Sequence, residues 1–159
     1  PQYAQIFWRN KFYNTDHDVF DVSFKSAHGK YLVAEKNGNN NVNANRSAIG
    51  SWEKFTLNLL YSESDLNCIQ NGDQIAVSTQ GGYYLRANSN GDLDAKASAI
   101  NSWERFTLIN HSDASGCLQS GDTISLKSAH NQFVVAESDG DANANRNAIG
   151  SWERFIVQY

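Results

Sequence analysis

One stretch of the sequence occurs three times, and this repetition constrains the fold more than any other feature. Its first copy reads NANRSAIGSWEKF, and the copies occupy residues 43–55, 94–106 and 143–155. Each copy contains Ser-Trp-Glu, and the tryptophans Trp52, Trp103 and Trp152 lie 51 and 49 residues apart. Because a unit of this length cannot bury an apolar face alone, we expect the three copies to share one core.

The residues before each stretch are repeated as well, in segments 22–38, 75–91 and 124–140. Apolar and polar residues alternate along each copy, which predicts β-strands, and no segment keeps a helical period. The alternating apolar positions that we expect to form the core are Val22, Phe24, Val42, Ala44, Phe55, Leu57, Ile75, Val77, Leu93, Ala95, Phe106, Leu108, Ile124, Leu126, Ala142, Ala144, Phe155 and Val157.

Turn-forming dipeptides separate these strands. They are His28-Gly29, Gly81-Gly82 and His130-Asn131 early in each copy, then Asn37-Gly38, Asn90-Gly91 and Asp139-Gly140. The second set contains residues that tolerate positive φ in tight hairpins. The first copy carries two extra residues, which we place at Asn39 and Asn40 in its polar turn. Each copy is therefore predicted to contain four strands.

Three copies of four strands predict an all-β fold, a β-trefoil with pseudo-threefold symmetry. In this fold a six-stranded barrel is closed at one end by three hairpins, which removes free strand edges. A chain of 159 residues suits one domain, expected at 20–159, with repeats of about 20–66, 67–115 and 116–159. Residues 1–19 are rich in aromatic side chains and are predicted to form a strap or a joint to a neighbouring domain.

Composition and charge exclude several classes of partner. The net charge is −4, and no concentrated Lys/Arg patch is present, which argues against nucleic acid and anionic membranes as partners. No apolar run approaches the roughly 18 residues of a membrane span. The chain contains no Met, so we expect a module cut from a longer protein, and we expect it to be a monomer.

The pattern of G-K-Y-L, N-G and S-W-E-x-F resembles the fascin-like branch of β-trefoils. The retention of Trp-Glu in all copies resembles carbohydrate-binding module family 92, whose members are appended to secreted bacterial polysaccharide-degrading enzymes. The resemblance covers about residues 20–159. It implies a secreted, non-catalytic module without cofactors, attached to a glycoside hydrolase. It also implies three equivalent sites for polysaccharide or oligosaccharide, with β-1,6- and/or β-1,3-linked β-glucan as the expected ligand.

The repeated Trp-Glu pair has the chemistry of a minimal sugar site. A pyranose ring can lie against a flat indole, while an adjacent carboxylate accepts hydrogen bonds from hydroxyl groups. The candidate sugar-binding residues are Trp52, Glu53, Trp103, Glu104, Trp152 and Glu153. In the alternative interpretation each Trp fills the hairpin end of its repeat, and each Glu accepts bonds from backbone N–H groups. The small and polar residues before each Trp favour a surface position.

Further polar residues could complete each site. In the third strand of each repeat, alternation places Ala inward and its polar neighbours outward, beside the Trp loop. These peripheral candidates are Asn43, Asn45, Arg46, Asp94, Lys96, Asn143, Asn145 and Arg146. A solvated polar hairpin face is the alternative. Because Ala97 replaces the arginine in the second copy, we expect the second site to differ in affinity or preference.

Metal ligation and a disulfide are not expected. The acidic segment 137–143 lacks the spaced ligands of a calcium loop, and His28 and His130 have no third ligand nearby. Cys68 and Cys117 occupy equivalent loops, and a disulfide is permitted in a secreted module. Loops that are related by threefold symmetry need not approach closely enough to be bridged, so we expect two free thiols.

Binding is favoured over catalysis. Glycoside hydrolysis needs two carboxylates about 5–10 Å apart, whereas the copies share one Glu and no second acid. We therefore expect no catalytic residues. An actin-bundling type of protein-interaction trefoil is an alternative, although it would be expected to show basic patches specific to one repeat. A free-standing lectin stays open as a third interpretation.

Overall fold

The computed structural model describes residues 17–63 and 67–159, so most of the segment predicted as a strap, residues 1–16, lies outside it. The described chain is all-β, as predicted. Its strands are β1 (Val19–Lys25), β2 (Tyr31–Ala34), β3 (Val42–Arg46), β4 (Phe55–Tyr61), β5 (Gln74–Thr79), β6 (Tyr84–Ala87), β7 (Leu93–Ala97), β8 (Phe106–Asn110), β9 (Thr123–Lys127), β10 (Phe133–Ala136), β11 (Ala142–Arg146) and β12 (Phe155–Gln158). Short 3₁₀ turns are η2 (Glu35–Asn37), η3 (Ser51–Glu53), η4 (Ser102–Glu104) and η5 (Ser151–Glu153). In this part of the chain, no helix has the length and apolar character needed to cross a membrane.

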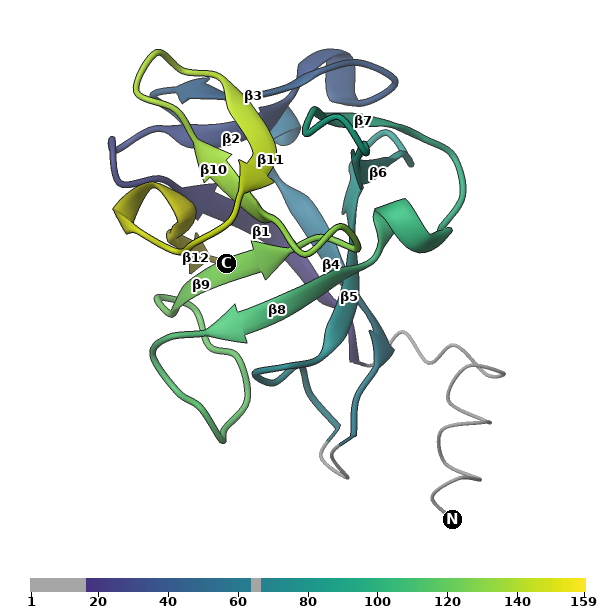
Figure 1. Cartoon of the computed structure of the whole chain (residues 1–159), viewed down its shortest axis with the longest axis vertical. Coiled ribbons are helices and arrows are strands. Elements are labelled where there is room, and N and C mark those ends of the chain that lie inside the picture. Colours follow the sequence, from purple (N-terminus) through teal and green to yellow (C-terminus); the bar gives the residue numbers. More distant parts are fainter. Residues whose placement is uncertain (1–16, 64–66) are drawn as a thin grey trace.

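The twelve strands form one antiparallel sheet. Strands β1, β4, β5, β8, β9 and β12 pair in this order, and β12 pairs again with β1, which closes a ring. The other strands form the hairpins β2/β3, β6/β7 and β10/β11, which lie together at one end of the molecule (Figure 1). Among the described residues, closure of the ring gives each of its six strands a neighbour on both sides, so the ring itself has no free edge for another chain to join.

The three hairpins are joined by backbone hydrogen bonds. Each third strand donates an alanine N–H to a carbonyl of another hairpin, over 2.8–2.9 Å. The pairs are Ala44 to Gly140, Ala95 to Asn40 and Ala144 to Gly91. The hairpins therefore support one another where they meet.

These bonds also locate the two extra residues of the first copy. Asn40 occupies the place of Gly91 and Gly140, so it is in register with the other copies, and the predicted insertion at Asn39 and Asn40 is wrong by at least one residue. The additional length lies within residues 36–39, after β2. It is accommodated by left-handed backbone at Lys36, Asn37 and Asn39, whose φ angles are 59°, 64° and 56°.

The predicted core is confirmed. Every alternating apolar position that we expected inside is at most 5% exposed. Phe24 packs against Phe55 and Phe155, with ring centroids 5.6 Å and 6.4 Å apart. The shared core thus lies within the ring of strands and beneath the hairpins, and it fixes the loops that follow the hairpins.

The two cysteines form a disulfide, so the expectation of two free thiols is wrong. The Cα atoms of Cys68 and Cys117 are 5.5 Å apart. The loops that carry them lie side by side, because the Leu118 N–H donates to the Ile69 carbonyl at 2.8 Å and Gln70 forms a β-bridge with Cys117. Equivalent loops of neighbouring repeats do meet at this end of the ring.

Candidate functional site

Each Ser-Trp-Glu sequence forms a single 3₁₀ turn just before the last strand of its repeat. In the first repeat the turn is closed by two backbone bonds, from Glu53 N–H to the Gly50 carbonyl at 3.2 Å and from Lys54 N–H to the Ser51 carbonyl at 3.3 Å. The preceding residue is extended, and β4 begins at Phe55, one residue after the turn. The turn is therefore short and anchored at both ends.

The glutamate of each turn is buried and bonds to the backbone. Its Oε1 accepts a hydrogen bond from the N–H of the residue three positions earlier, at 2.6 Å for Glu53 and Gly50. Glu104 and Glu153 make the same contact at 2.7 Å and 2.5 Å. The structural interpretation of the glutamates thus holds for Oε1, because this oxygen satisfies a backbone donor that the turn leaves free.

The tryptophans lie at the surface, as expected. Trp52, Trp103 and Trp152 are 37%, 38% and 37% exposed. Because the adjacent glutamate bonds to the backbone of the turn, the backbone that carries each indole is held in place. The exposed part of the ring is available for apolar stacking.

In the first repeat an arginine links this turn to the hairpin. Arg46 donates from Nη2 to Glu35 Oε1 at 2.6 Å, and its Nε lies 3.8 Å from Glu53 Oε2. Asn43 donates to the other oxygen of Glu35 at 2.9 Å, and Asn45 accepts from Arg46 at 2.7 Å. The predicted peripheral residues of this repeat are therefore brought together, on a carboxylate that the sequence reasoning missed.

The third repeat has the same network. Arg146 donates to Glu137 at 2.6 Å and lies 3.8 Å from Glu153 Oε2. Asn143 donates to Glu137 at 3.1 Å, and Asn145 accepts from Arg146 at 2.7 Å. Glu35 and Glu137 occupy the same place in the repeated sequence. The occurrence of glutamate in both copies is the sequence signal that could have identified them as part of the site.

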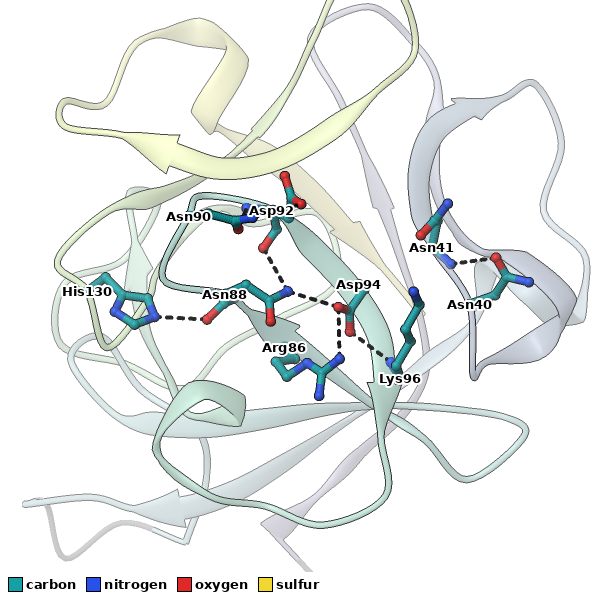
Figure 2. A network of polar contacts seen from close by, with 10 residues as sticks. Asn40, Asn41, Arg86, Asn88, Asn90, Asp92, Asp94, Lys96 and His130 are labelled. Carbon is teal, nitrogen blue, oxygen red and sulfur yellow. Dashed lines mark hydrogen bonds and ion pairs between the residues drawn. The ribbon is translucent and has the colours of Figure 1, made fainter.

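The second repeat also bonds an arginine and an asparagine to one carboxylate, but with its residues exchanged. Figure 2 shows the side chains of Arg86 and Asn88 directed at the Asp94 carboxylate, at 3.1 Å and 2.9 Å. The Lys96 N–H also donates to Asp94, at 2.9 Å. The acid lies on the third strand instead of after the second, and the arginine lies on the second strand instead of the third.

This exchange buries Asp94, which is 7% exposed. Alternation places Asp94 on the face opposite the buried Ala95, as expected, but Asp94 is not exposed beside the tryptophan loop, because Arg86 and Asn88 bond to its carboxylate. Burial alone would raise the pKa of Asp94, but the hydrogen bonds from Arg86, Asn88 and the Lys96 N–H and the charge of Arg86 lower it below its usual 3.8. The carboxylate therefore stays ionised.

The exchanged arginine reaches the second tryptophan turn. Arg86, Trp103 and Glu104 line a cleft of about 320 Å³ together with Asn101 and Ser102. Among the described residues, Arg86 Nε is buried without a hydrogen-bond partner. The amide side chain of Asn101 is a further difference, because glycine precedes the turn in the other repeats.

A second cleft of about 270 Å³ lies where the three hairpins meet. Lys96 lines it, beside Asp92 and Asp141, and does not line the cleft at Trp103. Three other peripheral candidates, Asn43, Asp94 and Asn143, line this cleft as well. In the described part of the chain, no cluster of three or more His, Cys, Asp or Glu side chains is arranged to hold a metal ion.

Two histidines reach the tryptophans from a different repeat. The ring of His28 lies 5.0 Å from Trp152, and that of His130 lies 5.2 Å from Trp103. The sequence gives no signal for these contacts, because the histidines are far from their tryptophans in the chain and their repeats first have to be placed side by side.

A scan against protein-family models and a search of curated proteins both find no match for this chain. The fold is similar to that in the crystal structure of the SDF2-like protein from Arabidopsis thaliana, with a TM-score of 0.69. The alignment covers 87% of this chain and 91% of that chain at 8% sequence identity. At this identity the similarity concerns the fold alone.

Proposed function

We propose that the fold is a β-trefoil with pseudo-threefold symmetry. The proposal is supported by the closed ring of six strands, by one hairpin in each sequence copy, and by the hydrogen bonds through which the hairpins support one another. In this arrangement the Ser-Trp-Glu turns are related by the symmetry of the repeats. Three similar binding sites would then face three directions.

We infer that the protein is a non-catalytic carbohydrate-binding module with three sugar sites, centred on Trp52, Trp103 and Trp152. The observation that carries this proposal is the repeated exposure of an indole on a turn fixed by the neighbouring buried glutamate. When a sugar ring stacks on such an indole, apolar surface of both rings is removed from contact with water, which favours binding. Because the turn is already ordered, binding a sugar costs little conformational entropy of the backbone.

The network beside each indole suits hydroxyl groups. In the first site Arg46 offers donors, whereas Glu35 and the second oxygen of Glu53 offer acceptors. A sugar hydroxyl can donate and accept, so it can bond to both members of a paired ion. The opposite charges within one network also favour a neutral ligand over a strongly charged one.

The ligand class and the biological setting rest on the resemblance to carbohydrate-binding module family 92. On this basis the polysaccharide is a β-glucan with β-1,6- and/or β-1,3-linkages, and the module targets an attached glycoside hydrolase. The disulfide between Cys68 and Cys117 supports a secreted location, because such bonds persist in oxidising compartments.

Three weak sites give tight retention on a polymer. One stacked ring with a few hydrogen bonds is expected to bind in the millimolar to micromolar range. A second site on the same polymer then binds as an intramolecular step, which raises the overall affinity without any new contact.

The test compares single, double and triple Trp→Ala variants at positions 52, 103 and 152. We expect retention on insoluble β-glucan to fall stepwise and to be lost in the triple variant, and calorimetry of the unmodified protein to give three oligosaccharides per chain. Phe20→Ala is the matched control, since Phe20 is 57% exposed and lies outside the turns. A stoichiometry of one, or retention by the triple variant, would refute the proposal.

Thermal melts of the same variants separate binding from folding. Because each indole is partly exposed, Trp→Ala should cost less than the roughly 3–5 kcal/mol of a buried aromatic. Glu53→Gln keeps an acceptor for the Gly50 N–H and removes the charge, so it should weaken its site about tenfold while the fold persists. Sharp destabilisation with glucan binding intact would assign Ser-Trp-Glu a purely structural role.

A further inference from the structure

His28 joins the first repeat to the tryptophan of the third. It lies in the turn between β1 and β2, and its Nε2 is 3.0 Å from the carbonyl oxygen of Ala136. Because a carbonyl only accepts, Nε2 carries the proton in this contact. The ring meets the Trp152 indole at an interplanar angle of 65°, so it is fixed by a hydrogen bond on one side and packs on the indole with the other.

His130 repeats this arrangement between the third repeat and the second. It lies in the turn between β9 and β10, its Nε2 is 3.0 Å from the Ala87 carbonyl, and its ring meets Trp103 at 67° (Figure 2 shows His130 reaching the second repeat). The sites of Trp103 and Trp152 are therefore each built from two repeats.

The Trp52 site is built differently. The turn between β5 and β6 has Gly81 where the other turns have histidine, and a Cβ atom there would lie 2.2 Å from the Asn37 carbonyl oxygen. The extra residues after β2 bring Asn37 to this place, where Thr79 Oγ1 donates to its carbonyl at 3.0 Å. The insertion and the glycine thus fit each other, and among the described residues no aromatic ring pairs with Trp52.

The three indoles nevertheless expose the same share of their surface, 37%, 38% and 37%. The histidines therefore do not cover the part of the ring that a sugar would use. They pack against the rest of the indole, so the described sites differ in the aromatic ring that packs on the tryptophan and not in the area that it offers.

We propose that His28 and His130 are positioning residues that fix the indoles of Trp152 and Trp103, so that these two sites bind sugar more tightly than the Trp52 site. This inference rests on the proposed function. An indole that is already held loses less side-chain freedom when a ligand binds. The difference corresponds to about two- to tenfold in affinity for one immobilised side chain.

The experiment uses three single-site proteins, each retaining one of Trp52, Trp103 and Trp152 with the other two replaced by alanine. Calorimetric titration with β-1,6-linked and β-1,3-linked glucotriose should give dissociation constants about two- to tenfold lower for the Trp103 and Trp152 proteins than for the Trp52 protein. Equal constants for all three would overturn the inference and leave the proposed function standing. Absence of binding in all three would overturn both.

Histidine substitutions identify the residue responsible. His28→Gln retains a donor for the Ala136 carbonyl and should weaken only the Trp152 protein, by the same factor. It should leave the Trp52 protein unchanged, although His28 and Trp52 belong to the same repeat. His130→Gln is the matched control, with its effect confined to the Trp103 protein. Equal weakening of all three proteins by either substitution would mean a general structural effect and would overturn the inference.

A spectroscopic measurement tests the contact without sugar. In protein labelled with 5-fluorotryptophan, His28→Gln should shift the ¹⁹F resonance of residue 152 and leave that of residue 52 in place, because only the former ring lies against His28. A Trp152 resonance that does not respond to His28→Gln would overturn the positioning role.

Discussion

The second repeat makes with Asp94, Asn88 and Arg86 the contacts that the first repeat makes with Glu35, Asn43 and Arg46. In the first repeat the acid follows the second strand and the amide lies on the third strand, whereas in the second repeat these places are reversed. The arginine lies on the third strand in the first repeat and on the second strand in the second repeat. The exchange is possible because Arg86 faces Asp94 across the β6/β7 pair, as Val33 faces Asn43 across β2/β3. Residues that face each other on paired strands are neighbours. The comparison teaches that an arginine, a carboxylate and an amide meet at this place in each repeat, although the strand that carries each of them differs.

The two versions differ in depth. The Asp94 side chain is 10% exposed, whereas those of Glu35 and Glu137 are 21% and 17% exposed. The shorter acid keeps the second network closer to the sheet, and its arginine lines the cleft at Trp103. In the other repeats the arginine instead approaches the glutamate of the turn.

The repeats also differ in their covalent links, and removing the disulfide should have the largest effect. The bond closes a loop with a sequence separation of 49 and ties the second repeat to the third. Restricting the unfolded chain in this way is worth about 4 kcal/mol in the chain-entropy estimate. The double substitution Cys68→Ser and Cys117→Ser should therefore lower the free energy of unfolding by about 2–4 kcal/mol in urea titrations. An unchanged midpoint would contradict this.

The next largest effect breaks the exchanged network alone. Asp94→Asn leaves Arg86 without its carboxylate and should cost about 1–2 kcal/mol, discounted because the arginine is partly exposed. The measurement is the midpoint of urea unfolding at neutral pH. A loss below about 0.3 kcal/mol would show that the network adds nothing to stability.

A control for the Asp94→Asn variant gives the network of the second repeat the residue order of the first repeat. The quadruple variant combines Asp94→Asn with Asn88→Glu, Arg86→Val and Ala97→Arg, which restores an acid, an amide and an arginine in the other order. We expect it to recover most of the stability lost by Asp94→Asn, because coupled residues are not additive. No recovery would show that the strand carrying each residue matters more than the contact.

Residues that pack by alternation could be predicted from the sequence. Val22, Phe24 and their equivalents are buried as expected, because the period of two fixes which side chains face the core. The exposed tryptophans were also predictable from the small residues around them. What these residues share is that their positions depend on local pattern.

Contacts across strands and between repeats could not be predicted in this way. Arg86 could have been noticed, since it replaces a valine in the repeat that lacks the third-strand arginine. The Cys68–Cys117 bond and the His28–Trp152 contact depend on which loops become neighbours around the ring. That is a property of the closed sheet, and spacing along the chain does not encode it.

A smaller loss of stability is expected from substitutions of the glutamate in the Ser-Trp-Glu turns. Glu53→Ala removes the acceptor for the Gly50 N–H and should destabilise the protein by about 1 kcal/mol, as the loss of a helix cap does. Glu104→Ala should act similarly, because Glu104 caps its turn with the same bond. Thermal melts of both, beside the corresponding Gln variants, check this. Equal melting temperatures for the Ala and Gln variants would show that the bond does not hold the turn.

The smallest effect is the acid dependence of the second network. Since the pKa of folded Asp94 lies below its usual 3.8, the folded state binds this proton less readily than the unfolded state. The resulting stabilisation is present above about pH 4 and is lost as the pH falls through the folded pKa. Urea unfolding from pH 6 to pH 2.5 should therefore show a shallower acid loss in Asp94→Asn than in the unmodified protein.

Asp18 is the opposite case, because burial raises its pKa despite the hydrogen bonds from Asn58 and Leu59. Asp18→Asn should steepen the acid loss, and parallel curves for all three proteins would show that neither carboxyl group is coupled to folding.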